Sequence, residues 1–176
     1  MKCELVDQRV RPESLPLDAT RLAALTGGLG RPDWVVNLVL VEDHVMADLY
    51  ERWYGATGVT DVLSFAYLEN AGAGEPDLAS GDRLAARDLW VAPGEVAEPV
   101  TVGEVILAPA FIAARCRAEG WDLEAEWALL VAHGCLHVLG WEHARATARR
   151  AMRACEAALL AQIGIAHPLA AEGTED

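Results

Sequence analysis

Three histidines in the second half of the chain have the spacing of metal ligands. They are His133, His137 and His143, in the segment HGCLHVLGWEH. Residues four apart on an α-helix lie on one face, one turn apart, so the first two imidazoles can reach one ion at about 2.0–2.1 Å. Gly140 can adopt a positive φ and turn the chain back, which brings the third imidazole to the same ion. The spacing predicts a three-histidine metal site.

Three protein ligands leave a tetrahedral ion one position for water, which is typical of catalytic zinc sites. Zinc can lower the pKa of that water to about 7 and so supply a nucleophile at neutral pH. It can also polarise a phosphoryl or a carbonyl oxygen, so the site could hydrolyse either a phosphodiester or an amide. His44 is expected to lie at the surface, and His167 is expected to play no part. Cys135 should point away from the ion, because it is two residues from His133 on the helix.

The same histidine spacing occurs in the metzincin proteases, H-E-x-x-H-x-x-G-x-x-H. Those enzymes need a glutamate directly after the first histidine as general base, and here that position is Gly134. No Met-turn follows His143 closely, because Met152 falls in a predicted helix. A zinc metalloprotease is therefore the weaker alternative.

The length and composition favour one folded domain. The chain has 176 residues, of which 53% are apolar, which suits one substantial core over 1–176. No apolar run approaches the roughly 20 residues that span a bilayer, and the N-terminus lacks the apolar run of a signal peptide. We therefore expect a cytoplasmic protein with no membrane partner. Its four cysteines form no C-x-x-C pair and are expected to be free thiols.

The charge argues against binding nucleic acid by bulk attraction, since the formal net charge is -13. The clearest basic cluster is Arg145, Arg149, Arg150 and Arg153. Spacings of four and eight from Arg145 place Arg149 and Arg153 on one stripe of a helix. The cluster is either a local nucleic-acid patch or a solvated helix face.

The elements that must position these residues do not alternate strictly between strand and helix. This favours an α+β fold, a small mixed β-sheet packed with about four to five helices, with the metal site at the end of a long helix. Residues 69–99 are expected to form a loop insertion with a short edge strand at 87–93. The strands are expected at 3–10, 35–41, 60–68 and 102–108, and the helices at 19–26, 43–54, 109–118, 122–139 and 144–163.

Two motifs resemble a known family, the YbeY-type endoribonucleases of bacterial ribosomal RNA maturation. The histidine segment is similar to its signature H-G-x-L-H-L-x-G-[YW]-[DE]-H, with Val138 at a Leu position. A second signature, T-D-V-L-S-F, is unchanged at 60–65, and GEVIL at 103–107 is similar to a third. The resemblance covers about residues 35–163, and its motifs are unrelated to one another and occur in the family's order.

The resemblance implies one Zn²⁺ per chain, or another divalent ion, held by His133, His137 and His143. It implies a hydrolase that cleaves single-stranded RNA, with water on the ion as nucleophile, in 16S rRNA 3′-end maturation and ribosome quality control. The partners would be the rRNA precursor and the small ribosomal subunit, with no DNA expected. Glu126 and Glu156 fall where the family tends to carry acids.

Asp61 is the candidate catalytic residue beyond the metal ligands. It could orient a ligand histidine or act as a base, or it could cap the start of a strand. Alternation along a regular strand places Asp61 and Ser64 on opposite faces, so only one of them can point into a cleft.

The chain departs from the family at Tyr54, which stands where an arginine thought to contact phosphate is expected. A phenol stabilises developing phosphoryl charge poorly. Tyr54 and the net charge favour a second hypothesis, a metal-stabilised ribosome-assembly factor with little catalysis of its own. The open three-histidine site favours the endoribonuclease.

Overall fold

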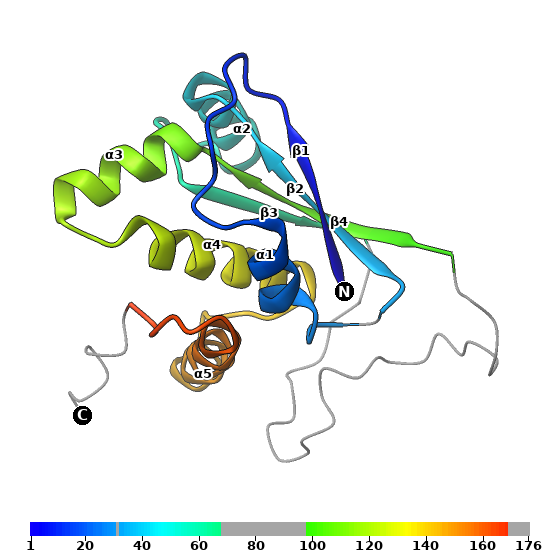
Figure 1. Ribbon diagram of the computed structural model, residues 1–176. Coiled ribbons are helices and arrows are strands. Elements are labelled where there is room, and N and C mark those ends of the chain that lie inside the picture. Colours follow the sequence, from blue (N-terminus) through cyan, green and yellow to red (C-terminus); the bar gives the residue numbers. More distant parts are fainter. Residues whose placement is uncertain (31, 68–97, 169–176) are drawn as a thin grey trace.

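The computed structural model describes residues 1–30, 32–67 and 98–168, and these residues are built around a four-stranded sheet (Figure 1). The sheet has the order β1-β2-β4-β3, with β1, β2 and β4 parallel and β3 antiparallel to β4. It is therefore mixed, as predicted. The strands are β1 (Lys2–Asp7), β2 (Trp34–Leu40), β3 (Val62–Ala66) and β4 (Val100–Leu107).

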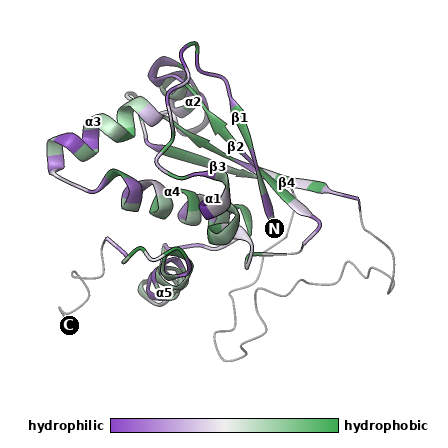
Figure 2. Ribbon diagram, viewed as in Figure 1, coloured by the Kyte–Doolittle hydropathy of each residue, from purple (hydrophilic) through white to green (hydrophobic). Residues whose placement is uncertain are grey.

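Five helices of the described residues pack in layers on this sheet, which confirms the α+β prediction. One face is covered by α1 and α4, and α5 lies beneath α4 as a third layer, while α2 covers the opposite face. The residues buried between the sheet and the helices are apolar, and the strands are coloured mostly as hydrophobic in Figure 2. The helices are α1 (Ala19–Thr26), α2 (Asp43–Tyr54), α3 (Pro109–Glu119), α4 (Leu123–Val138) and α5 (Ala146–Gln162).

Helix α4 is the central element, because it lies between the sheet and α5. Its N-terminus is capped by Asp122, whose carboxylate accepts a hydrogen bond of 2.8 Å from the backbone N–H of Ala125. Eleven of its 16 residues are buried, so most of its circumference is covered by protein. Burial of that apolar surface holds the helix rigidly, and the predicted metal ligands stand at its C-terminal end.

The opposite face of the sheet has its own smaller core against α2. Met46 of α2 is fully buried among Val39, Leu63 and Ile106. These three residues come from neighbouring strands and share one face by alternation. The two cores together fix the sheet, and with it the strand β3 that carries the second family motif.

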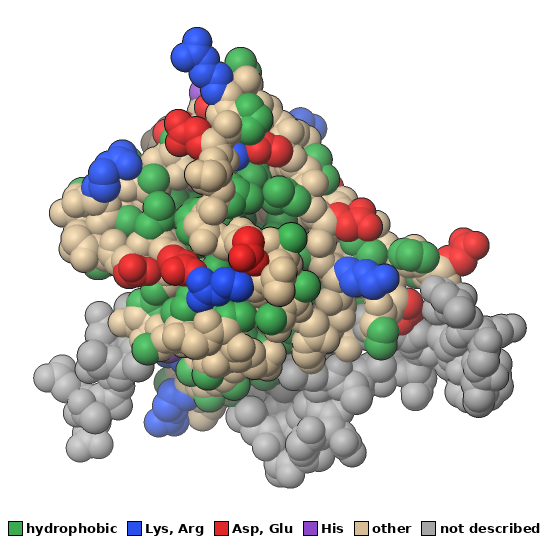
Figure 3. Space-filling model, viewed as in Figure 1, with side chains coloured by type: hydrophobic (Ala, Val, Ile, Leu, Met, Phe, Trp, Pro, Cys, Tyr) green, Lys and Arg blue, Asp and Glu red, His purple; other side chains and the backbone are tan. Residues whose placement is uncertain are grey.

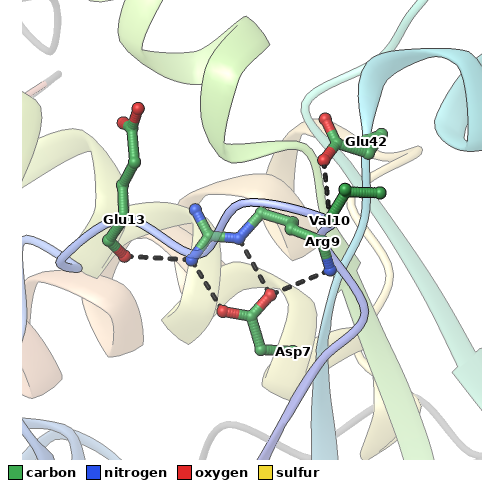
Figure 4. A network of polar contacts seen from close by, with 5 residues as sticks. All are labelled: Asp7, Arg9, Val10, Glu13 and Glu42. Atoms are coloured by element: carbon green, nitrogen blue, oxygen red, sulfur yellow. Dashed lines mark hydrogen bonds and ion pairs between the residues drawn. The ribbon is translucent and has the colours of Figure 1, made fainter.

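The connection between β1 and α1 is held against the start of α2 by a polar network (Figure 4). Arg9 donates hydrogen bonds of 2.9 and 2.8 Å to the carboxylate of Asp7 and one of 3.0 Å to the backbone carbonyl of Glu13. The backbone N–H of Val10 donates to the carboxylate of Glu42 at 3.1 Å. The network therefore ties this connection to β1 and to the N-cap residue of α2.

The predicted insertion at 69–99, with its edge strand at 87–93, lies almost wholly outside the described residues and stays a prediction. The predicted helix bounds differ from the observed ones by no more than two residues at either end. Within the described ranges, no helix has both the length and the apolar character needed to cross a bilayer.

Candidate metal centre

The C-terminus of α4 turns at Gly140, as the sequence predicts. Gly140 has φ +85°, and its N–H donates to the carbonyl of His137 at 2.9 Å. The N–H of Trp141 donates to the carbonyl of Leu136 at 3.0 Å. This pair of bonds is the Schellman motif, which satisfies carbonyls at the helix end and reverses the chain. The reversal carries His143 back toward the helix end.

The structure brings His133, His137 and His143 together. One ligand nitrogen from each ring can be chosen so that the three atoms lie within 4.8 Å of one another. The ring centroids of His133 and His137 are 4.5 Å apart, and that of His143 lies 5.3 and 4.9 Å from them. No Cys, Asp or Glu of the described residues joins this group. The arrangement matches the open three-ligand pattern that the spacing predicts.

Each of the two helical histidines is oriented through its Nδ1 atom. His133 Nδ1 lies 2.8 Å from Oε1 of Glu156, and His137 Nδ1 lies 2.9 Å from the backbone carbonyl oxygen of Trp141. Both partners are acceptors, so each Nδ1 carries the proton in the neutral ring. Each Nε2 is then an unprotonated lone pair, and the two Nε2 atoms face one another at 3.1 Å.

Two unprotonated nitrogens that face one another at this distance repel unless a metal ion or a proton lies between them. Two nitrogens bound at about 2.05 Å to one tetrahedral ion lie about 3.3 Å apart, close to the observed separation. The donor set therefore fits a divalent ion with nitrogen affinity.

Electrostatics favour the ligand form of these groups. Burial, followed by the neighbouring His133 and His143, lowers the pKa of His137, so its neutral ring is favoured. Burial by itself raises the pKa of Glu156, but hydrogen bonds from His133 and His167 outweigh it and hold that pKa below its ordinary value. The buried carboxylate is therefore ionised and is an acceptor for His133.

Sequence reasoning gave no role to His167 and none of its own to Glu156. The structure places His167 in the interior, 8% exposed, with Nε2 at 3.1 Å from Oε2 of Glu156. Glu156 thus joins two histidines through its two oxygens. The expectation that His167 plays no part is wrong in this respect, whereas His44 is exposed as expected. The spacing of Glu156 on α5 could have shown that it shares a face with Met152, but not which histidine it meets.

Asp61 lies at the start of β3, where its carboxylate accepts a hydrogen bond of 2.9 Å from the N–H of Val62. Arg115 of α3 bridges it to Glu126 in the first turn of α4 through an ion pair with each carboxylate. Burial opposes the charge of Arg115, but these two carboxylates outweigh it and raise the pKa of Arg115 above its usual value. The catalytic role of Asp61 stays a prediction, and its contacts favour positioning of β3 against α4.

Gly134 is buried where α4 crosses the sheet. A Cβ at this position would lie 2.6 Å from Cγ1 of Val105 and 3.0 Å from Oγ of Ser64. The residue after the first histidine therefore faces β3 and β4, not the histidine cluster. A glutamate here would meet the sheet, so the arrangement disfavours the metalloprotease chemistry.

Two further sequence interpretations concern side chains outside the cluster. Cys135 is fully buried with Sγ 4.0 Å from Sγ of Cys3, so it faces β1 and not the histidine cluster, as expected. Tyr54 is the last residue of α2 and is 60% exposed, and its ring centroid lies 5.7 Å from that of Tyr50. Arg52 lies over the ring of Trp53, with its guanidinium carbon 5.9 Å from the ring centroid.

Comparison with known proteins agrees with the motifs. The family model described as "Endoribonuclease YbeY" matches residues 19–164. The endoribonuclease YbeY of Mycobacterium leprae is 37% identical over 125 residues, which cover 71% of this chain and 61% of that protein. The endoribonuclease YbeY of Nocardia farcinica is 38% identical over 125 residues, which cover 71% of this chain and 59% of that protein. The matched stretch thus spans less than two thirds of these relatives' own length.

Among solved structures, the chain is similar to a solution structure from Thermotoga maritima. The sequence identity is 19% and the TM-score is 0.49, with 82% of this chain and 77% of that chain covered.

Proposed function

The chain belongs to the YbeY endoribonuclease family, and from this membership we propose that it is a metal-dependent endoribonuclease that cleaves single-stranded RNA. We propose the whole of residues 1–176 as one hydrolase domain. Its substrate would be an rRNA precursor in 16S rRNA 3′-end maturation and ribosome quality control, its partner the small ribosomal subunit, and its location the cytoplasm.

The observation that supports this proposal most is the pair of Nε2 lone pairs on His133 and His137 at 3.1 Å, with His143 beside them. These three residues would hold the ion, with Zn²⁺ as the first candidate. When bound, such an ion supplies a Lewis acid that activates water and polarises a phosphoryl oxygen.

The chain's own residues set up the site for that chemistry. Glu156 and the carbonyl of Trp141 accept the Nδ1 protons, which leaves the Nε2 atoms of His133 and His137 free to hold an ion. The exposed ring of His143 leaves that side of the site open to a long substrate. Asp61 is proposed to act on this site through its contacts at the start of β3, by orienting the strand that packs against α4.

RNA cleavage can be tested with a variant that removes one ligand. Wild-type protein and His133→Ala, purified identically, would be incubated with a labelled single-stranded RNA and with its duplex. The proposal expects metal-dependent cleavage of the single strand by wild type and background cleavage by His133→Ala. His44→Ala is the matched control, because His44 is exposed and outside the cluster. Equal cleavage by wild type and His133→Ala would indicate a contaminating nuclease and overturn the proposal.

A second candidate function is a metal-stabilised assembly factor with little catalysis. The observations that favour it are the exposed phenol of Tyr54 at the position of the family's arginine and the net charge of -13. A folded, metal-loaded wild type that binds small ribosomal subunits but leaves single-stranded RNA intact would support this function instead.

A further inference from the structure

A cavity of about 250 Å³ opens beside the histidine cluster, between α4 and α5. His133 and His143 form one part of its wall, and Leu129, Leu130 and Met152 form an apolar part. The cavity is therefore continuous with the candidate metal centre.

Two arginines of α5 line the same cavity. Arg149 and Arg153 are four residues apart, so they lie on one helix face with Met152 between them. Arg149 donates through Nε to the backbone carbonyl of His143 at 3.4 Å, which leaves its two terminal nitrogens available to a ligand. Arg153 is half-buried.

Within the described ranges, neither Arg149 nor Arg153 forms an ion pair. The acid nearest to them in the cavity wall is Glu156, and both of its oxygens are used by histidines. Figure 3 shows blue Lys or Arg atoms at the lower left of the described residues, where α5 lies in Figure 1. In a chain of net charge -13, two guanidinium groups without anionic partners beside a metal centre are the feature that requires an explanation.

We propose that Arg149 and Arg153 bind one phosphate group of the RNA strand while the neighbouring phosphate lies at the metal centre. The nucleotide that joins the two phosphates would then lie over the apolar wall of the cavity. This inference rests on the proposed function for the identity of the ligand. Guanidinium groups match phosphate geometry through paired N–H donors. Placed beside the metal centre, they would attract the negative charge of a second phosphate group. The local pair of cations also explains how an acidic protein would hold RNA without a basic surface.

Binding of an RNA that stays intact during the measurement tests the subsite separately from catalysis. The probe is a fluorescein-labelled, single-stranded oligouridylate with 2′-O-methyl groups throughout, titrated with metal-loaded protein and followed by fluorescence anisotropy. Gel electrophoresis after each titration checks that the probe is uncleaved. We expect Arg153→Gln to weaken binding about tenfold. The plot of log K against log salt concentration has a negative slope, and this slope should become shallower by about 0.7, as for one lost phosphate contact to a single strand. Arg149→Gln should weaken binding similarly.

Arg150→Gln is the matched control, because it removes the same charge from the neighbouring, exposed position outside the cavity wall. Its binding should change less than twofold. Metal content and the thermal midpoint of each variant are measured alongside, so that a loss through misfolding is recognised. Arg153→Lys, which keeps the charge but not the planar pair of donors, should recover only part of the affinity.

The outcomes separate this inference from the proposed function. If wild type cleaves RNA and Arg153→Gln binds the oligouridylate as well as wild type does, the subsite is wrong and the endoribonuclease stands. If Arg150→Gln weakens binding as much as Arg153→Gln does, general charge explains the effect and the subsite is wrong. If wild type binds through Arg149 and Arg153 without cleaving, the subsite stands and the catalytic function fails. Absence of oligouridylate binding by folded, metal-loaded wild type overturns the subsite.

Discussion

Nδ1 of His133 on α4 lies 2.8 Å from Oε1 of Glu156 on α5, and the other oxygen of this carboxylate meets His167. The contact joins the last two long helices at the edge of the candidate metal centre. It sets both the ring orientation and the tautomer of His133, because a carboxylate can only accept the Nδ1 proton.

Glu156→Gln should weaken metal binding about 10- to 100-fold, the usual effect of losing a carboxylate that orients a metal-bound histidine. The neutral amide is a weaker acceptor, and it can present its N–H₂ group to His133 in place of an oxygen. Competition with a chromogenic chelator measures the affinity. Glu119→Gln, an exposed acid at the end of α3, is the control and should leave the affinity unchanged. Equal affinity of Glu156→Gln and wild type would show that the contact does not support the site.

His137→Ala should abolish the response of protein stability to chelator. An ion that binds only the folded state stabilises it in proportion to RT ln(1 + [L]/Kd), so stripping it should lower the thermal midpoint of wild type. The variant lacks one of the facing Nε2 atoms, so its midpoint should be the same with and without chelator. Calorimetry together with elemental analysis checks this. A wild type that is folded, prepared without chelator and free of metal would refute the metal centre.

Gly134→Ala should destabilise the protein by about 1–3 kcal/mol, as overpacking of a well-packed core does. The new methyl group would lie 2.6 Å from Cγ1 of Val105, so α4 must move away from β4. Denaturant unfolding measures the free energy. Gly28→Ala is the control, because its Cβ would meet only the side chain of Gln162, at 3.7 Å. If both variants unfold like wild type, the close approach of α4 to the sheet is not as described.

Arg115→Met should cost about 1–3 kcal/mol of stability at neutral pH, because the carboxylates of Asp61 and Glu126 lose their shared partner. The cost arises because two carboxylates are left without a cation. Urea unfolding measures the free energy. Arg117→Met, an exposed arginine on the same helix, is the control and should leave the stability unchanged. Equal stability of Arg115→Met and wild type would show that the two ion pairs do not stabilise the fold.

Tyr54→Arg should raise RNA cleavage by about tenfold or more, if the position serves as the family resemblance implies. A guanidinium group stabilises developing phosphoryl charge, which a phenol does poorly. Single-turnover cleavage of single-stranded RNA is the measurement. Thr57→Arg adds the same charge at another exposed position nearby and should have little effect. An equal gain in both variants would mean that added charge alone improves RNA binding.

The sequence alone determined most of the described elements and the clustering of the three histidines. Apolar periodicity and caps such as Asp122 predict the helices, because these signals act between residues close in the chain. The i, i+4 spacing of His133 and His137 and the glycine at Gly140 predict the three-histidine cluster for the same reason. Local geometry leaves few ways to build a helix followed by a left-handed turn.

Only the tertiary structure decided what surrounds these ligands. Glu156 meets His133 because α5 packs on α4 at one particular rotation, and no local rule relates residues 23 apart in the chain. Arg115 joins Asp61 to Glu126 because α3 packs against α4. Arg149 and Arg153 face a cavity because the packing of α5 on α4 leaves space there. Such contacts depend on how helices dock, which is settled by the complementarity of whole surfaces and not by any short segment.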